Sequence, residues 1–471
     1  MPHTPDVRHA VVVDLGFGDA GKGTVVDRLC ALGARGTGAE PVHTVVRFNG
    51  GAQAAHNVVT PDGRHHTFAQ FGSGTFTPGV RTHLSRFMMV DPLALAAEHE
   101  HLRALGVRDA FARLTVNWDA PLTTPYHQAA NRARETARGA ARHGSCGMGV
   151  GETAAYALTH PDLAPRAGDC LTPARLRRRL TTLRDWYHDT FPAAEQPLSR
   201  PAPSAEPAPD TGLAPAAAVP SAAAVPDVEL VPDVDDCVAA FLAFGASVRI
   251  VDDGYLPRVL RTGRVVFEGA QGVLLDEWHG FHPYTTWSTT TFANAETLLA
   301  EAREPGFRLG VLRAYATRHG PGPFVTEDPA LTADLPDPHN GTGPWQGAFR
   351  VGHLDTVALD YAVRAAGGVD GLAVTHLDVA SSRPDLRICR AYTMDGATVR
   401  HLPFDAAHDL ERQGALTERL LAARPVLEPL GDPVAAVEDA LGVRVVLRSH
   451  GPTSNDKAGT LLGEHESSYS L

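Results

Sequence analysis

The feature that most constrains this chain is a glycine-rich loop near its start, set between a valine-rich run and a helical pattern. The apolar run His9 to Leu15 is too short for a helix, so it predicts a buried parallel strand. The loop Gly16-Phe17-Gly18-Asp19-Ala20-Gly21-Lys22-Gly23-Thr24 follows, and apolar residues then recur at helical spacing. A strand, a glycine loop and a helix in this order open a doubly wound α/β unit.

The loop admits three interpretations. Gly16-x-x-x-x-Gly21-Lys22 has the spacing of a P-loop, in which backbone N–H groups surround phosphate and the lysine adds positive charge, although Gly23 replaces the usual Ser or Thr. The same glycines fit a dinucleotide fingerprint, but that motif needs an acidic residue after the second strand, where the chain reads Arg47-Phe48-Asn49. A tight turn without a ligand is the third possibility. The residues favour phosphate binding.

Further strands are expected along the whole chain. The second strand, Val42 to Phe48, leads into a loop of small residues, Asn49 to His56. Other runs of strand type are 248–251, 264–267, 310–312, 371–375 and 444–447. We therefore expect an α/β fold with a central, mostly parallel sheet and additional helical and loop subdomains.

A Pro- and Ala-rich stretch interrupts this pattern. Residues 192–232 cannot bury enough apolar surface to order themselves, so they are predicted to form a flexible insertion. Residues 1–191 and 233–471 would then be the N-terminal and C-terminal parts of one domain. A linker between two domains is the alternative.

Composition limits the class of protein. The 471 residues carry a net charge of -12, which argues against a general nucleic-acid binder, because phosphate backbones require clustered Lys and Arg. The five cysteines are scattered and form no CxxC pair, which favours reduced thiols over disulfides or a zinc site. No secretion signal or membrane-spanning apolar run is visible. A cytoplasmic enzyme is expected.

Longer segments carry a specific resemblance. They are Gly50 to His56, Phe267 to Asp276 with His279-Gly280 and Tyr284 to Thr286, Ala314 to Phe324, Gly352 to Ala358, and Thr375 to Val379. Together with the opening loop, these segments resemble adenylosuccinate synthetase, in family order from about residue 9 to residue 452. The family joins aspartate to inosine monophosphate at the expense of GTP. The resemblance implies the fold of that family, a GTP-dependent ligase, and GTP and Mg²⁺ as cofactors.

The resemblance also assigns roles to matched residues. It implies Asp19 as the base that removes the ring N–H proton and contacts Mg²⁺, His56 as the acid, and Lys22 as a catalytic phosphate contact. Ala55 would be the second contact of the metal. The GTP site implied by the match comprises Gly18, Gly21, Lys22, Gly23, Thr24, Ala55, Asn57, His376, Asp378, Ser449 and Gly451.

The acceptor nucleotide would be held by uncharged side chains. The matching residues are Gln53, Ser145, Gln271 and Thr286; Gln53 replaces an Asn of the family and Ser145 a Thr. The family's shared active site implies a homodimer, although no counterpart is found for the arginine that a partner subunit normally contributes.

The loop that would bind the amine donor departs from the family. A dicarboxylate needs bidentate arginines, and the family has several in this loop. In this chain the loop contains Trp345, Gly347 and Phe349, and Arg350 is the one arginine that it retains. Met148 likewise stands at an arginine position. We therefore expect a changed amine or acceptor and a role in specialised metabolism. The ordinary reaction with aspartate and a nucleotide-binding descendant without turnover remain alternatives, and a dehydrogenase is remote.

Overall fold

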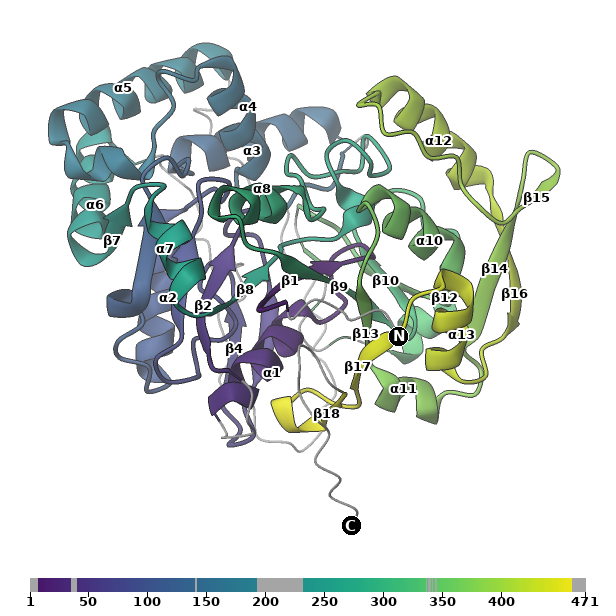
Figure 1. The fold of residues 1–471 in the computed structure, drawn as a ribbon. Helices are drawn as coiled ribbons and strands as arrows, with labels where there is room; N and C mark the ends of the chain where they lie inside the picture. Colours follow the sequence, from purple (N-terminus) through teal and green to yellow (C-terminus); the bar gives the residue numbers. More distant parts are fainter. Residues whose placement is uncertain are drawn as a thin grey trace, which may run out of the picture.

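A ten-stranded sheet forms the centre of the molecule (Figure 1). The computed structural model describes residues 7–34, 40–139, 142–192, 232–335, 337, 340, 342–343 and 345–459. In sheet order the strands are β18 (Lys457–Ala458), β17 (Val445–Ser449), β13 (Gly371–Thr375), β9 (Gly306–Arg313), β1 (His9–Asp14), β8 (Arg264–Glu268), β2 (Val42–Arg47), β5 (Arg81–Leu84), β6 (Leu114–Asn117) and β7 (Arg249–Val251). Their pairings are parallel except that of β17 with β18.

Helices surround the sheet in two groups. A lobe beside β5 to β7 contains α2 (Pro92–Ala104), α3 (Pro125–Arg138), α4 (Val150–Thr159), α5 (Pro173–Thr190) and α6 (Val234–Ser247). Figure 1 shows α4, α5 and α6 at upper left and α2 below them. The other helices are α1 (Lys22–Ala34), α7 (Tyr255–Thr262), α8 (Ala293–Ala302), α9 (Pro329–Asp334), α10 (Thr356–Ala365), α11 (Leu377–Ser382), α12 (Leu410–Ala422) and α13 (Pro433–Leu441). Among the described helices none is both long and apolar enough to cross a membrane.

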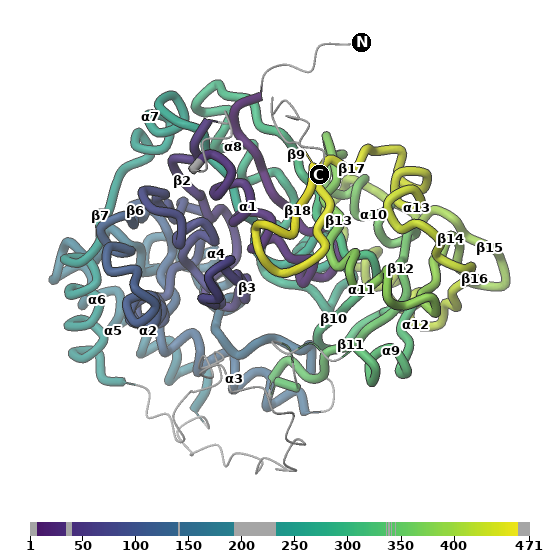
Figure 2. Tube along the Cα trace, turned by 90° about the horizontal axis from the view of Figure 1, so that it is seen from below, coloured from purple at the N-terminus to yellow at the C-terminus, as the bar shows by residue number. Residues whose placement is uncertain are grey.

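Smaller sheets extend the central layer. They are the hairpin β3 (His56–Val59) with β4 (His65–Phe68), the pair β10 (Ala316–His319) with β11 (Phe349–Gly352), and a sheet of β12 (Leu354–Asp355), β14 (Arg387–Met394), β15 (Ala397–Val399) and β16 (Arg424–Pro429). Figure 2 shows β10 beside β11, with β3 to their left and the C-terminal segment that carries β17 and β18 above them.

Alternating side chains of β1 join two separate apolar cores. Val11 and Val13 belong to the large cluster that includes α8 and α10, whereas Ala10 and Val12 pack with α1 through residues such as Val25. A strand buried on both faces must be apolar throughout, which is why this segment reads as a continuous run of Val in the sequence.

The expected strands are confirmed at all seven predicted places, with ends shifted by a few residues, and the α/β class with its mostly parallel sheet is confirmed. The predicted insertion falls almost entirely on residues 193–231, which lie outside the described residues. The parallel pairing brings the carboxyl ends of β2, β8, β1, β9 and β13 to one edge, where ligands of doubly wound folds bind.

Candidate active site

The loop after β1 is held in shape by hydrogen bonds among its own residues and Asp14. Gly18 and Gly21 have φ values of +118° and +89°, which residues with a side chain rarely adopt. The Lys22 Nζ is buried, donates to the Gly18 carbonyl oxygen at 2.7 Å and lies 3.2 Å from an Asp14 oxygen. The lysine is thus directed back into the loop from the first turn of α1.

Gly23 is explained by its contact with His56. A Cβ on Gly23 would lie 2.8 Å from the Cβ of His56 and 3.1 Å from its carbonyl carbon. The Ser or Thr found at this place in most P-loops would therefore push His56 away. The glycine allows α1 to approach the residue expected to act as the acid.

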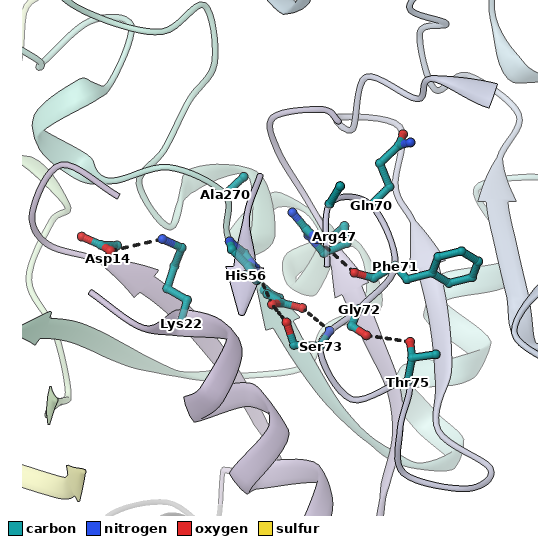
Figure 3. Close-up of polar contacts among 12 residues, drawn as sticks. Asp14, Lys22, Arg47, His56, Gln70, Phe71, Gly72, Ser73, Thr75 and Ala270 are labelled. Atoms are coloured by element: carbon teal, nitrogen blue, oxygen red, sulfur yellow. Dashed lines mark hydrogen bonds and ion pairs between the residues drawn. The ribbon is translucent and has the colours of Figure 1, made fainter. Parts of the chain in front are cut away.

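His56 is held by a buried carboxylate, Glu268, at the end of β8. The His56 Nδ1 lies 2.6 Å from Glu268 Oε1, and the Ser73 N–H donates to Oε2 at 2.9 Å. The Ser73 hydroxyl also donates to Glu268. Figure 3 shows His56 and Ser73 converging here, with Lys22 on the opposite side of His56. With Nδ1 bonded to Glu268, Nε2 is the ring nitrogen left to meet a ligand.

Burial and charge set the protonation of this pair. Burial lowers the pKa of His56 to about 4, while the charge of Glu268 and the hydrogen bond act in the opposite direction. Burial alone would raise the pKa of Glu268, but His56 and the nearby Arg47 guanidinium lower it to about 2. The negative charge of Glu268 thus opposes the effect of burial and favours the protonated imidazole, the form that can donate a proton from Nε2.

Asp19 is half-buried on the loop, close to other charged groups. Burial raises its pKa, and the negative charge of Asp14 acts in the same direction, whereas Arg313, Lys22 and His319 oppose the shift. The Arg313 Nε donates to the Asp19 carbonyl oxygen at 2.5 Å. A carboxylate with a raised pKa is suited to accept a proton, as a general base must.

Two segments next to predicted GTP residues contact the loop and the start of α1. The Thr24 hydroxyl donates to the Pro452 carbonyl oxygen at 2.7 Å, and the Thr375 hydroxyl donates to the Ala20 carbonyl oxygen at 2.7 Å. His376 follows with a φ of +58°, in the left-handed region, so its backbone is held in a sparsely populated conformation.

Other predicted nucleotide residues differ in their surroundings. Asp378 is exposed in the first turn of α11, while Ser449 is buried and donates to the Gly451 carbonyl oxygen at 3.2 Å. Ala55 is exposed, and the Asn57 side-chain oxygen accepts from His65 and Thr67 of the β3–β4 hairpin. The side-chain oxygen of Asn57 is thus already bonded within the hairpin.

Two predicted acceptor residues present unpaired polar groups. Both amide atoms of Gln53 and the Oε1 of Gln271 are buried without a hydrogen-bond partner among the described residues. A Cβ on Gly50 would lie 3.0 Å from the Gln53 Nε2 and 3.4 Å from the Gln271 Oε1, so the two side chains converge on this loop. The Gln271 Nε2 donates to the Thr286 hydroxyl oxygen at 2.5 Å. Buried polar atoms without partners are typical of a ligand site.

Ser145 lies on a separate loop, which contacts the predicted amine loop. Its hydroxyl accepts from Asn131 at 2.8 Å. On the same loop, a Cβ on Gly147 would lie 2.9 Å from the Trp345 ring, and one on Gly144 would lie 2.3 Å from Pro321. The two predicted loops therefore face each other.

Arg350 is occupied by its own loop. Its Nη1 pairs with Glu327 at 2.7 Å, and its Nη2 donates to the carbonyl oxygens of Gly320 and Gly322 at 2.7 and 3.0 Å. Phe349 is buried on β11, and Gly347 has a φ of +94°. The arginine that could hold a carboxylate of the amine donor is thus used as a structural brace.

The residues present fit a magnesium nucleotide. Among the described residues no cluster of His, Cys, Asp and Glu could enclose a metal ion alone. Mg²⁺ usually takes one or two carboxylates together with substrate phosphates and water, so Asp19 beside a phosphate loop suffices.

The fold is that of a doubly wound α/β protein, and it brings the predicted phosphate loop and the start of α1 against His56 and its partner Glu268. The sequence model described as adenylosuccinate synthetase matches residues 11–206 and 221–457. The chain belongs to the adenylosuccinate synthetase family, whose members are GTP-dependent carbon–nitrogen ligases.

Individual relatives support the same family assignment. The chain is 30% identical to adenylosuccinate synthetase of Anaeromyxobacter sp. (strain Fw109-5), over 97% of this chain and 99% of the relative. It is 33% identical to that of Xanthomonas campestris pv. campestris (strain B100), over 84% and 83%.

Two solved structures share the fold. Fully ligated adenylosuccinate synthetase from Plasmodium falciparum matches with a TM-score of 0.75 at 20% identity, over 96% of this chain and 100% of the other. Cyanophage S-2L succinoaminodeoxyadenylate synthetase, bound to dGMP and dATP, matches with a TM-score of 0.58 at 18% identity, over 97% of both chains.

Sequence reasoning gave no role to several residues of the site. Glu268 lay inside a matched segment, yet its contact with His56 joins residues more than two hundred positions apart. Asp14 and Arg313 end neighbouring strands of the sheet, and both contact the loop that carries Asp19. A charged residue at the end of an apolar strand is the signal that could have singled them out.

Proposed function

We propose that this chain uses GTP and Mg²⁺ to phosphorylate the lactam oxygen of a purine-nucleotide-like acceptor and then replaces the phosphate with an amine other than aspartate. A role in specialised metabolism would suit such a change of donor. The proposal is supported by a contrast between the residues proposed for phosphorylation and the loop proposed to bind the amine. The residues proposed for phosphorylation lie on or against one loop, whereas the proposed amine loop offers an Arg350 that is already bonded to Glu327 and Gly320, beside Gly347 and Phe349.

In the first half, Asp19 takes the ring N–H proton and the electron pair moves onto the lactam oxygen, which attacks the γ-phosphorus of GTP. The bond to the β-phosphate oxygen breaks and GDP leaves. His56, oriented by Glu268, stabilises the charge between the transferring group and GDP, while Lys22 and the start of α1 hold the phosphates. Bound Mg²⁺ would neutralise charge on the phosphates, with Asp19 and the Ala55 carbonyl as its protein contacts.

In the second half, the amine nitrogen adds to the ring carbon and gives up a proton to water, and the bond from that carbon to the phosphate oxygen breaks. Phosphate leaves with the electron pair, and it is a far better leaving group than the lactam oxygen. Binding aspartate through Arg350 would break its bonds to Glu327 and to the loop carbonyls. Each charge-assisted bond contributes about 1.5–3 kcal/mol. A donor without a second carboxylate avoids this cost.

The acceptor would meet the buried amides of Gln53 and Gln271 and the hydroxyl groups of Thr286 and Ser145. The proposed nucleotide site comprises Gly18, Gly21, Gly23 and Thr24 of the loop and α1, with His376, Asp378, Ser449 and Gly451 around the base. A homodimer is proposed from the family's habit of sharing its active site.

Phosphate release from GTP tests the proposal, measured over a matrix of 6-oxopurine nucleotides and nucleosides against candidate amines, with Asp19→Asn as the inactive control. We expect release that requires both an acceptor and an amine and that is lost in Asp19→Asn. Formation of adenylosuccinate from inosine monophosphate and aspartate at ordinary rates would favour the ordinary reaction. Tight GTP binding without release would favour a nucleotide-binding descendant.

A further inference from the structure

Asp14 is a buried carboxylate that the mechanism above does not use. It ends β1, the strand between β8 and β9 at the middle of the sheet, and is 1% exposed. Burying an ionised carboxylate is costly unless hydrogen bonds and opposite charge compensate it. Its partners therefore indicate what the residue does.

Among the described residues, the hydrogen-bond partners of Asp14 belong to the phosphate loop and the start of α1. One carboxylate oxygen accepts from the Gly16 N–H at 2.7 Å. The other accepts from the Ala20 N–H at 2.7 Å and from the Lys22 Nζ at 3.2 Å. The loop is thus fastened to one carboxylate on both sides of Asp19.

The contact with Ala20 fixes one particular peptide group. The N–H of the peptide between Asp19 and Ala20 donates to Asp14, and the carbonyl oxygen of the same peptide accepts from Arg313 at 2.5 Å. Bonds to both ends of one peptide plane fix its rotation. The backbone of Asp19 is thereby fixed, and the efficiency of a general base depends on such positioning.

The contact with Lys22 has an electrostatic consequence. Lys22 and Asp14 are each 1% exposed, so their attraction is weakly screened by water. The ammonium that is expected to meet the phosphates of the nucleotide is partly neutralised, and polyphosphate must compete with Asp14 for it. Asp14 thus improves the position of the base while weakening nucleotide binding.

We propose that Asp14 is a positioning residue: together with Arg313 it clamps the Asp19–Ala20 peptide, and it restrains Lys22 inside the loop. The role of Asp19 as the base comes from the proposed function, on which this inference rests. The restraint on Lys22 depends only on the geometry of the loop.

Two substitutions separate the two roles. Asp14→Asn removes the charge, so Lys22 is released, and we expect the Kd of a non-hydrolysable GTP analogue with Mg²⁺ to fall about tenfold by calorimetry. Asp14→Glu keeps the charge but displaces the oxygens, so the Kd should stay within about twofold of the unsubstituted protein. Both substitutions should lower kcat for phosphate release about tenfold or more, because the peptide clamp is disturbed.

A matched control comes from Asp169, which is equally buried and pairs with Arg175 and Arg179 in the helical lobe. Asp169→Asn should lower the melting temperature while leaving the Kd and kcat unchanged. A purely structural role for Asp14 predicts weaker binding in proportion to lost stability. Weaker or unchanged binding in Asp14→Asn, or wild-type kcat in both variants, would overturn the inference.

The inference and the proposed function can fail separately. If the unsubstituted protein turns over no acceptor with any amine, the proposed function fails, whereas the Kd comparison still tests the restraint on Lys22. If it does turn over and the Asp14 variants match it in both readouts, the inference fails alone.

Discussion

Replacing Glu268 with Gln should damage catalysis far more than it damages folding. Glu268 is fully buried and holds the His56 Nδ1 at 2.6 Å, with Ser73 as its other partner. Glutamine keeps the size but loses the charge, and its amino group must face either His56 or Ser73. Losing one charge-assisted hydrogen bond costs about 1.5–3 kcal/mol. Since about 1.4 kcal/mol corresponds to a tenfold change in rate, kcat should fall roughly 10- to 100-fold.

The assay is phosphate release from GTP with the acceptor and the amine that give the highest turnover. Glu98→Gln is the matched control, because Glu98 is also buried and accepts from the N–H groups of Ala69 and Gln70 instead of from His56. The control should lower the melting temperature while kcat stays within about twofold. If Glu268→Gln folds and keeps kcat within the same range, Glu268 does not orient the catalytic histidine.

Two further predictions concern packing and pH. Gly23→Ala should lower kcat, because the added Cβ would lie 2.8 Å from the Cβ of His56. The control is Gly414→Ala in α12, where a Cβ would have no neighbour within 4 Å; it should leave kcat unchanged and raise the free energy of unfolding by about 1 kcal/mol. Equal kcat in both variants would contradict the proposed clash between Gly23→Ala and His56. Burial lowers the pKa of His83 to about 4 and of His127 to about 3, so the unfolded chain binds protons that the folded chain does not, and stability should fall as pH drops from about 6.5 to about 4. Denaturant titrations should show His127→Gln reducing that slope by about 1.4 kcal/mol per pH unit, and an unchanged slope would show that His127 takes up its proton in the folded state.

The sequence predicted the framework of the site better than its internal contacts. Val-rich runs identified β1, β2 and β8 because strands buried on both faces must be apolar. The strands β5 and β6 were not predicted: Arg81–Leu84 and Leu114–Asn117 are short and mix Thr, His, Arg and Asn with apolar residues. Their burial depends on the helical lobe that packs beside them.

In the candidate site, too, the loop was predicted from the sequence, whereas the contacts between distant residues were not. Spacing alone indicated a phosphate loop, and the family match added Asp19 and His56. The brace that Arg350 makes with Glu327 was not predicted, because an arginine looks the same in a sequence whether it binds a ligand or its own loop. The clamp by Asp14 and Arg313 also required the register of β1 and β9, which local patterns do not encode.

The most direct test of the account is to identify the product by mass spectrometry from inosine monophosphate, GTP, Mg²⁺ and an equimolar mixture of aspartate and monocarboxylate amino acids. We predict a condensation product with a donor that lacks the second carboxylate, formed faster than adenylosuccinate and lost in Asp19→Asn. Adenylosuccinate as the main product would contradict the changed donor, and a product formed equally without GTP would contradict the phosphorylating half of the site.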